Sequence, residues 1–129
     1  MSRFTPSLLV IAAVLLAGCA PTSTDQIAAA TPERQCMFPD DVQSFRVRAA
    51  DRTVFVRGTS NAVFELQPAG DCNGLNEAMR LAVVDQVSRV CVGDWTTITS
   101  SPSPAPCRVR VVKRLTAAEV AALPDRDRP

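Results

Sequence analysis

The residue whose surroundings point most clearly to a reaction is Cys19. It directly follows Gly18 at the end of an apolar run from Leu8 to Ala17, and Arg3 gives the preceding segment a positive charge. A basic start, about ten apolar residues and a small-residue cleavage site are typical of a secretory signal peptide. The run is too short to span a bilayer, which takes roughly 20 apolar residues. The sequence therefore predicts a signal peptide over residues 1–18 and export of the rest.

The residues Leu16-Ala17-Gly18-Cys19 resemble the lipobox of bacterial lipoproteins. In that family the cysteine sulfur is diacylated, the signal is cut before it, and the new amino terminus is acylated. The resemblance thus implies anchoring to a membrane through acyl chains at Cys19, and two or more chains hold a protein there essentially permanently. Ala20 is not the Asp that retains some lipoproteins in the inner membrane, which implies the outer membrane, facing the periplasm. An ordinary secretory signal with a chance cysteine is the alternative.

Four further cysteines follow in the exported part: Cys36, Cys72, Cys91 and Cys107. An even number of cysteines in a small exported domain favours two disulfides. Among the three pairings we favour Cys72–Cys91 nested inside Cys36–Cys107, because it ties the ends of the domain together. A zinc site is the alternative, but no two cysteines have the C-x₂₋₄-C spacing and the sequence has no histidine. The sequence predicts no metal and no cofactor.

The sequence gives little indication of acid–base catalysis. Without histidine there is no His-dependent triad and no histidine acid or base, so we expect a non-catalytic protein. Asp40 and Asp41 are adjacent and point to opposite faces of an extended chain, which favours a solvated turn over a hydrolytic or calcium-binding pair. Asp71 and Asp94 are expected to cap loop amides. The alternative is that these two line a pocket near Cys72.

Basic residues alternate with apolar ones along three predicted strands: Arg46, Arg48, Arg57, Arg108 and Arg110. If these strands are neighbours, the arginines form a basic stripe suited to phosphate or carboxylate groups of lipopolysaccharide or of an envelope protein. The alternative is a solvated sheet face whose charges are offset by Glu65 and nearby Asp residues. Trp95, the sole tryptophan, is expected to pack in the core against Cys91 rather than to form an exposed platform. Removal of Arg3 with the signal leaves 13 of the 14 basic residues beside 13 acidic ones, which argues against nucleic-acid binding.

The elements that must position these residues are mostly strands. Residues 19–35 are rich in Pro, Thr, Ser and Ala and form a lipidated flexible tether, because they cannot bury enough apolar surface to fold. Period-two alternation predicts strands over 44–48, 53–57, 62–66, 89–92, 95–99 and 107–113. The expected core-facing set is Phe45, Val47, Val54, Val56, Phe64 and Leu66.

Two helices are predicted. Apolar residues at helical spacing indicate a short helix over residues 73–81. Thr116 and Glu119 form a capping box, with Leu115 and Val120 as a hydrophobic staple, and Pro124 ends this second helix. Residues 100–106 contain three prolines and are expected to form an exposed loop. The remaining residues 124–129 read as a charged, frayed tail.

Together these elements predict a mainly β (α+β) domain over residues 36–123: a small antiparallel meander sheet or partly open barrel of about 5–6 strands with one or two short helices, stapled by disulfides. Its motifs are Ser44-Phe45 with Val47, Asp51-Arg52-Thr53-Val54, Phe64-Glu65-Leu66, Gly70-x-Cys72-x-Gly74-Leu75, Cys91 with Asp94, and Cys107-Arg108-Val109 leading to Leu115-Thr116-x-x-Glu119-Val120. In these motifs the chain resembles a family of small Gram-negative bacterial lipoproteins with a cysteine-containing β-rich domain of unknown function. The resemblance implies no catalytic residues.

The expected function is that of a lipid-anchored cell-envelope protein acting as a non-catalytic accessory or interaction module. The alternative is a periplasmic lipoprotein that binds a small molecule, glycan or peptide through the loop near Cys72 and Asp94. An enzyme is the least favoured reading. The expected partners are the membrane, through the acyl chains, and an envelope protein or lipopolysaccharide, with no nucleic acid.

Overall fold

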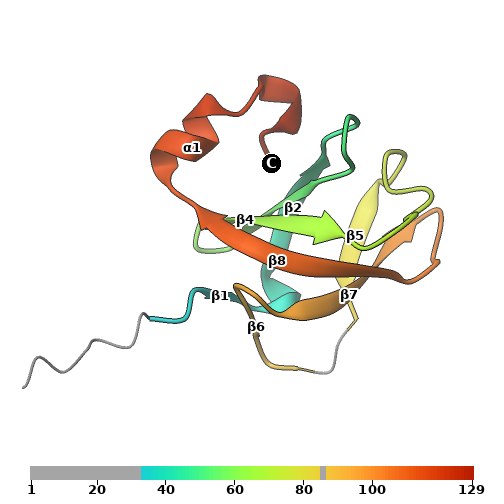
Figure 1. Ribbon diagram of the computed structural model, residues 1–129, viewed down its shortest axis with the longest axis horizontal. Coiled ribbons are helices and arrows are strands. Elements are labelled where there is room, and N and C mark those ends of the chain that lie inside the picture. The colour runs from blue at the N-terminus through green and yellow to red at the C-terminus, as the bar shows by residue number, and fades with distance from the viewer. Residues whose placement is uncertain (1–32, 85–86) are drawn as a thin grey trace, which may run out of the picture. The chain divides into compact units, whose positions relative to one another are not determined.

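Short antiparallel strands make up most of the regular secondary structure of the described chain (Figure 1). The structure is a computed structural model and describes residues 33–84 and 87–129; Cys19, the predicted signal peptide and most of the predicted tether lie outside these residues. In spatial order, the larger sheet contains β2 (Val42–Val47), β3 (Val54–Gly58), β4 (Val63–Pro68), β8 (Cys107–Leu115), β7 (Trp95–Ser101) and β5 (Arg80–Val83). A second sheet pairs β1 (Cys36–Met37) with β6 (Val90–Cys91).

The six-stranded sheet curves until its edge strands β2 and β5 contact each other, so that it forms a nearly closed barrel (Figure 1). The remaining elements of the described chain are short: η1 (Pro39–Asp41), α1 (Ala117–Ala122) and η2 (Asp125–Asp127). The predicted fold class, mainly β with a partly open barrel, is confirmed. No helix within residues 33–84 and 87–129 has the length and apolar character needed to cross a membrane.

The barrel interior is filled by alternate residues of the strands, as period-two patterning predicts. Val54, Val56, Phe64 and Leu66 are at most 2% exposed, and Ile98, Val109 and Val111 join them in one cluster. Phe45 and Val47 are partly buried and pack against the same cluster. The predicted core-facing set is therefore confirmed.

Tight turns connect the first three long strands. The turn between β2 and β3 is closed by the N–H of Arg52, which donates to the carbonyl of Arg48 over 2.8 Å, and Arg52 has a φ of 59°. Asp51 supports this left-handed residue, since its carboxylate accepts a hydrogen bond of 3.1 Å from the N–H of Thr53. In the next turn the left-handed position is Asn61, also at 59°, a residue type that tolerates this conformation.

The helix predicted over residues 73–81 is wrong: the segment consists of turns and the beginning of β5. Gly74 has a φ of 83°, which a right-handed helix excludes, and a Cβ there would lie 2.7 Å from the Cβ of Ser103. Leu75 is 2% exposed whereas Met79 is 77% exposed, so the helical spacing of these residues does not mark one buried face.

Both disulfides are present, but the favoured pairing is wrong. The bridges are Cys36–Cys91 and Cys72–Cys107, not the nested arrangement. Cys36 and Cys91 are direct cross-strand partners in β1 and β6. Cys72 follows β4, whose last residues pair with the first residues of β8, which begins at Cys107. Strand pairing, rather than closure of the chain ends, selects the partners.

Helix α1 begins as predicted. Thr116 is the N-cap: its hydroxyl accepts from the N–H of Glu119 over 3.2 Å, and the Glu119 carboxylate accepts from the N–H of Thr116 over 2.7 Å. Leu115 and Val120 pack in the same apolar cluster, which confirms the staple. The helix ends before Pro124. The helix therefore begins and ends at the residues that sequence reasoning identified.

The C-terminal residues do not form the frayed tail predicted for 124–129. They include η2, and Asp127 is only 3% exposed. Arg128 fixes the segment, because its guanidinium donates to the carbonyls of Val120, Ala121 and Leu123 over 3.2, 3.0 and 2.8 Å. The last carbonyls of a helix have no partner within the helix. Here Arg128, eight residues after Val120, donates hydrogen bonds to these carbonyls.

Candidate functional site

Of the five arginines named for the predicted basic stripe, Arg57 lies on β3 and the other four lie in two separate places. Arg46 is on β2 and Arg48 directly follows this strand, whereas Arg108 and Arg110 are on β8, and β3 and β4 lie between β2 and β8. Glu65 of β4 occupies part of the intervening surface, where it is 4.0 Å from Lys113. The four arginines therefore do not form one continuous stripe, because the strands that carry them are not neighbours.

The β2 pair is engaged in local structure. Arg48 donates to both carboxylate oxygens of Asp51, at 2.9 and 2.7 Å, and lies 5.2 Å from the centre of the Phe55 ring. The hydrogen bond from this guanidinium holds the pKa of Asp51 well below its usual range. Arg46 donates to the carbonyl of Phe45. These contacts stabilise the β2–β3 turn and leave Arg48 little capacity for a ligand.

Trp95 lies at the surface, contrary to the prediction that it packs in the core. It is 47% exposed, while Thr96 and Ile98 of the same strand are buried. Alternation along β7 explains the difference, since Thr96 and Ile98 fill the interior and Trp95 falls on the outer face. Arg108 lies 5.1 Å from the Trp95 ring centre, and Arg110 is the cross-strand partner of Trp95. The β8 arginines thus flank an exposed aromatic side chain.

The acidic candidates act mainly as turn residues. Asp94 accepts a hydrogen bond of 3.0 Å from the N–H of Cys91, which confirms its role in capping a loop amide. Asp71 pairs with Arg52 at 3.1 Å and helps to line a shallow hollow near Cys72, to which Asp94 does not contribute. Asp40 belongs to η1. Within the described residues, no group of three His, Cys, Asp or Glu side chains is placed to hold a metal ion.

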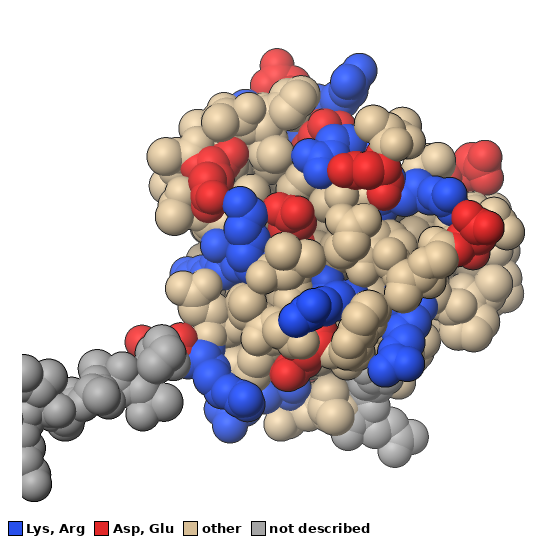
Figure 2. Space-filling model, viewed as in Figure 1, with Lys and Arg blue, Asp and Glu red and all other residues tan. Residues whose placement is uncertain are grey.

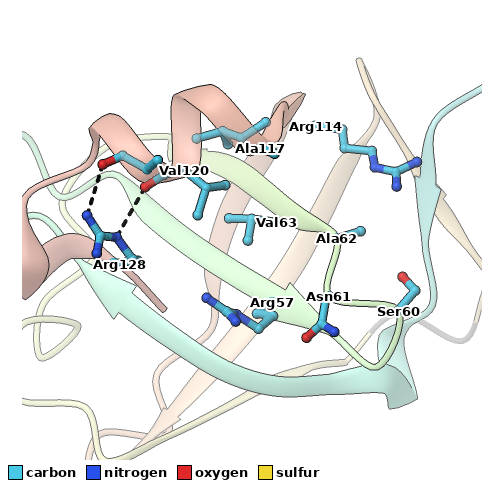
Figure 3. Close-up of a pocket in the computed structure, with 11 residues that line it drawn as sticks. Arg57, Ser60, Asn61, Ala62, Val63, Arg114, Ala117, Val120 and Arg128 are labelled. Atoms are coloured by element: carbon cyan, nitrogen blue, oxygen red, sulfur yellow. Dashed lines mark hydrogen bonds between the residues drawn. The ribbon is translucent and has the colours of Figure 1, made fainter.

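Another cavity, not anticipated from the sequence, lies between α1 and the β3–β4 turn; we call it the α1 pocket (Figure 3). Its volume is about 500 Å³ and it is open to solvent. One side is apolar and is formed by Ala62, Val63, Leu115, Ala117, Val120 and Ala121. The polar side chains that line it are Arg57, Ser60, Asn61, Arg114 and Arg128.

Two of the three arginines in the α1 pocket have donors available. Arg128 is committed to the carbonyls at the end of α1 and to Asp125, at 3.1 Å. Arg57 and Arg114 make no ion pair within residues 33–84 and 87–129, and the Nε atom of Arg57 is buried there without a hydrogen-bond partner. A buried donor that lacks a partner costs free energy. Figure 3 shows the Arg57 guanidinium beneath Val63.

The charge and shape of the α1 pocket indicate which class of ligand it can bind. No carboxylate is among its lining residues, so the charge of Arg57 and Arg114 is not neutralised there. Guanidinium groups bind carboxylate and phosphate groups through paired hydrogen bonds. The apolar wall beside them suits a hydrocarbon body. Of the two free arginines, sequence analysis singled out Arg57 from strand alternation, but only the tertiary fold makes it line the same pocket as Arg114.

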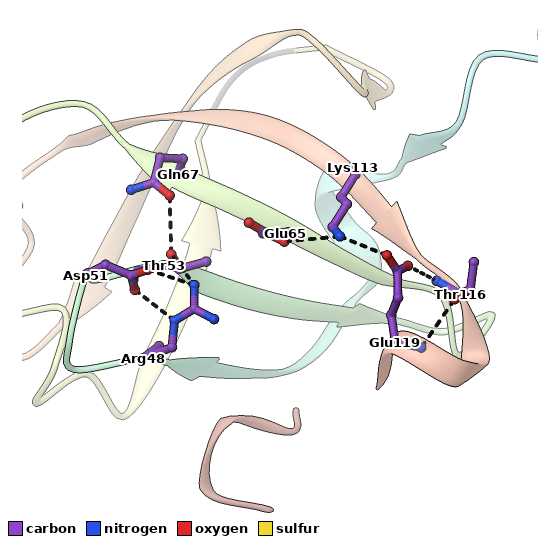
Figure 4. A network of polar contacts seen from close by, with 8 residues as sticks. All are labelled: Arg48, Asp51, Thr53, Glu65, Gln67, Lys113, Thr116 and Glu119. Carbon is purple, nitrogen blue, oxygen red and sulfur yellow. Dashed lines mark hydrogen bonds and ion pairs between the residues drawn. The ribbon is translucent and has the colours of Figure 1, made fainter. Parts of the chain in front are cut away.

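A polar network on the outer face holds α1 to the sheet (Figure 4). Lys113 is 2.9 Å from Glu119, and Glu119 also caps the helix through Thr116. The Lys113 ammonium, followed by the Thr116 N–H, lowers the pKa of Glu119 to about 2. Glu119 therefore stays ionised, and the network fixes the wall of the α1 pocket.

Comparison with known proteins places the chain in a family. A model described as a family of unknown function, DUF6491, matches residues 2–128. None of the curated proteins and none of the solved structures compared with the chain matches it. The family match spans nearly the whole chain but carries no activity, so function has to be argued from the residues themselves.

Proposed function

From the residues of this chain, which belongs to DUF6491, a family of unknown function, we propose that the protein is a lipid-anchored cell-envelope protein. Its domain is a non-catalytic binding module for a small molecule with an acidic group. The observation that carries the proposal is the α1 pocket, where Arg57 and Arg114 stand beside an apolar wall. A concave site with few convergent polar groups is the usual form of a small-molecule site. An amphipathic acid, with a carboxylate or phosphate on a short hydrocarbon chain, matches both sides of it.

The chemistry of the lining residues supports binding rather than turnover. The pocket contains no carboxylate, and the sequence contains no histidine to move a proton at neutral pH. Its one hydroxyl nucleophile, Ser60, has no general base among the pocket residues. The four cysteines of the domain are all in disulfides. Arginine, asparagine and serine side chains can hold an anion without transforming it.

The anchor is tested by metabolic labelling with a clickable fatty acid. We expect the wild-type protein to take up label and to sediment entirely with membranes, because its acyl chains insert into the bilayer. The Cys19→Ser variant should take up no label and should appear in the aqueous fraction. Equal labelling of both proteins, or a wild-type protein without label, would overturn the lipid anchor.

The α1 pocket is tested by calorimetric titration with decanoate and decyl phosphate, with decanol as the neutral control. We expect both anions to bind, and Arg57→Gln to weaken their binding about 10- to 100-fold, since a hydrogen bond to a charged group contributes roughly 1.5–3 kcal/mol. The affinity of decanol for the wild-type protein should be no higher than the affinity of decanoate or decyl phosphate for the Arg57→Gln variant. Arg80→Gln is the matched control, because Arg80 is exposed on β5 and is not a pocket residue.

Two results would contradict the binding proposal. One is the absence of heat with either anion. The other is an Arg57→Gln protein that binds decanoate as tightly as Arg80→Gln does, since the anion would then lie elsewhere.

A second candidate function, that of an accessory protein with a protein partner, is favoured by the surface around Trp95. Val92 and Val112 are 39% and 42% exposed, and the turn between β6 and β7 bonds to Val111 through Gly93. Exposed apolar side chains beside an aromatic residue and arginines are typical of interaction surfaces. Cross-linking in envelopes, with Trp95→Ser as the comparison, distinguishes a partner on this surface from a ligand in the α1 pocket.

A further inference from the structure

A second basic hollow lies where the described chain begins. It has a volume of about 290 Å³ and is lined by Glu33, Arg34, Gln35, Cys36, Phe38, Arg89 and Arg114. We call it the entry hollow. Three of these residues are arginines and one is acidic. In Figure 2 basic side chains gather on the surface beside the first described residues.

The arginines of the entry hollow are available for a ligand. Within the part of the chain that the structure describes, Arg34, Arg89 and Arg114 form no ion pair, and all three are exposed. After Glu33, the next acidic residues along the chain, Asp40 and Asp41, do not line the hollow; they belong to η1, which contacts β5. The local charge is therefore positive although the whole domain is close to neutral.

An exposed aromatic residue stands at the same hollow. Phe38 is 55% exposed, although most large apolar side chains of the described residues are buried or partly buried. The disulfide between Cys36 and Cys91 fixes the backbone beside it. An exposed aromatic ring beside basic residues is the combination found where proteins rest on the interfacial region of a membrane.

The length of the chain before the domain brings this end close to the lipid. Fourteen residue steps separate Cys19 from Glu33, a span of at most about 50 Å when fully extended. Since the anchored segment joins the domain at Glu33, the entry hollow lies at the end of the domain to which the tether is attached. Tethering raises the effective concentration of the hollow at the membrane surface.

We propose that the entry hollow is a membrane-docking surface, on which Arg34 and Arg89 bind phosphate groups of anionic lipids while Phe38 enters the headgroup region. The inference rests on the lipid anchor of the proposed function and adds a second contact to it. Docking orients the domain, with α1 and the α1 pocket held at a defined position above the bilayer.

The test uses the mature chain, residues 19–129, with Cys19→Ser, so that acyl chains do not contribute. Its co-sedimentation is measured with vesicles of phosphatidylcholine alone and of phosphatidylcholine containing one third phosphatidylglycerol. We expect binding to the anionic vesicles, weakened by higher ionic strength. Arg34→Gln with Arg89→Gln should lower the partition coefficient about 30-fold, because each basic residue near an anionic surface adds about fivefold. Phe38→Ser should also weaken binding.

The matched control is Arg46→Gln with Arg80→Gln, which removes the same charge from strands away from the hollow and should leave vesicle binding unchanged. Equal loss in both double variants would overturn the proposal, since net charge alone would then explain binding. Absence of vesicle binding would overturn it as well. Binding of free inorganic phosphate with release from the vesicles would show a soluble-anion site instead. Decanoate titration of the Arg34→Gln, Arg89→Gln protein reports separately on the α1 pocket, so failure here leaves the proposed function standing.

Discussion

Reduction of both disulfides is expected to unfold the domain. The two bridges close loops of 55 and 35 residues, and each loop of this length corresponds to about 4 kcal/mol of lost entropy in the unfolded chain. The loops overlap, so removing both costs less than the sum of the two. The total still approaches the stability of an ordinary small domain, about 5–15 kcal/mol. Urea denaturation with and without reductant, followed by circular dichroism, measures the loss.

Paired alanine variants test the connectivity itself. Cys36→Ala with Cys91→Ala removes one bridge and should cost about 4 kcal/mol. Cys72→Ala with Cys91→Ala should be far less stable and should contain two free thiols, because Cys36 and Cys107 are not partners. If the latter protein instead retained a disulfide and the stability of the single-bridge variant, the nested pairing would be correct.

Much of the fold follows from local sequence patterns. Alternation over residues 44–66 predicts β2, β3 and β4 and the faces of their side chains, because a strand with one buried face has a side-chain period of two. The capping box at Thr116 predicts where α1 begins, since the cap is a contact between residues three apart. Features that depend on residues close together in the sequence could thus be predicted without the structure.

Features that depend on residues far apart in the sequence could not be predicted. The disulfide partners depend on the pairing of β1 with β6 and of β4 with β8, which no local pattern reports. Leu75 and Met79 have helical spacing, yet the positive φ at Gly74 and the hydrogen bond from the Met79 N–H to the Ser101 carbonyl hold them in turns. Tertiary contacts override a weak helical pattern.

The candidate sites show the same difference between features set by local sequence and features set by the tertiary fold. Arg57 was identifiable as a polar alternate of β3, but that it lines the same pocket as Arg114 of β8 is a consequence of sheet order. Arg128, placed in a tail by sequence reasoning, completes the α1 pocket because it binds the end of α1. The arginines of β2 and β8 were expected together, and the intervening strands keep them apart.

Phe55→Ala is expected to cost about 3–5 kcal/mol, the loss typical of a large buried aromatic residue. Alternation along β3 directs Phe55 away from the barrel interior, to the face that would be solvent-exposed in a simple meander. It is nevertheless only 1% exposed, because α1 and the residues after it cover this face. Val63 and Leu115 are buried with it, and Val120 of α1 packs against the cluster. Urea denaturation gives the free energy of unfolding.

Phe38→Ala is the matched control, because it is the same substitution at a ring that is 55% exposed. It should change the free energy of unfolding by no more than about 0.5 kcal/mol, as is usual for surface positions. A large cost at Phe55 and a small one at Phe38 would show that α1 seals a second apolar cluster on the outside of the barrel. Similar small costs at both positions would mean that α1 does not cover the sheet in solution, and the α1 pocket, whose wall is this helix, would then be lost with it.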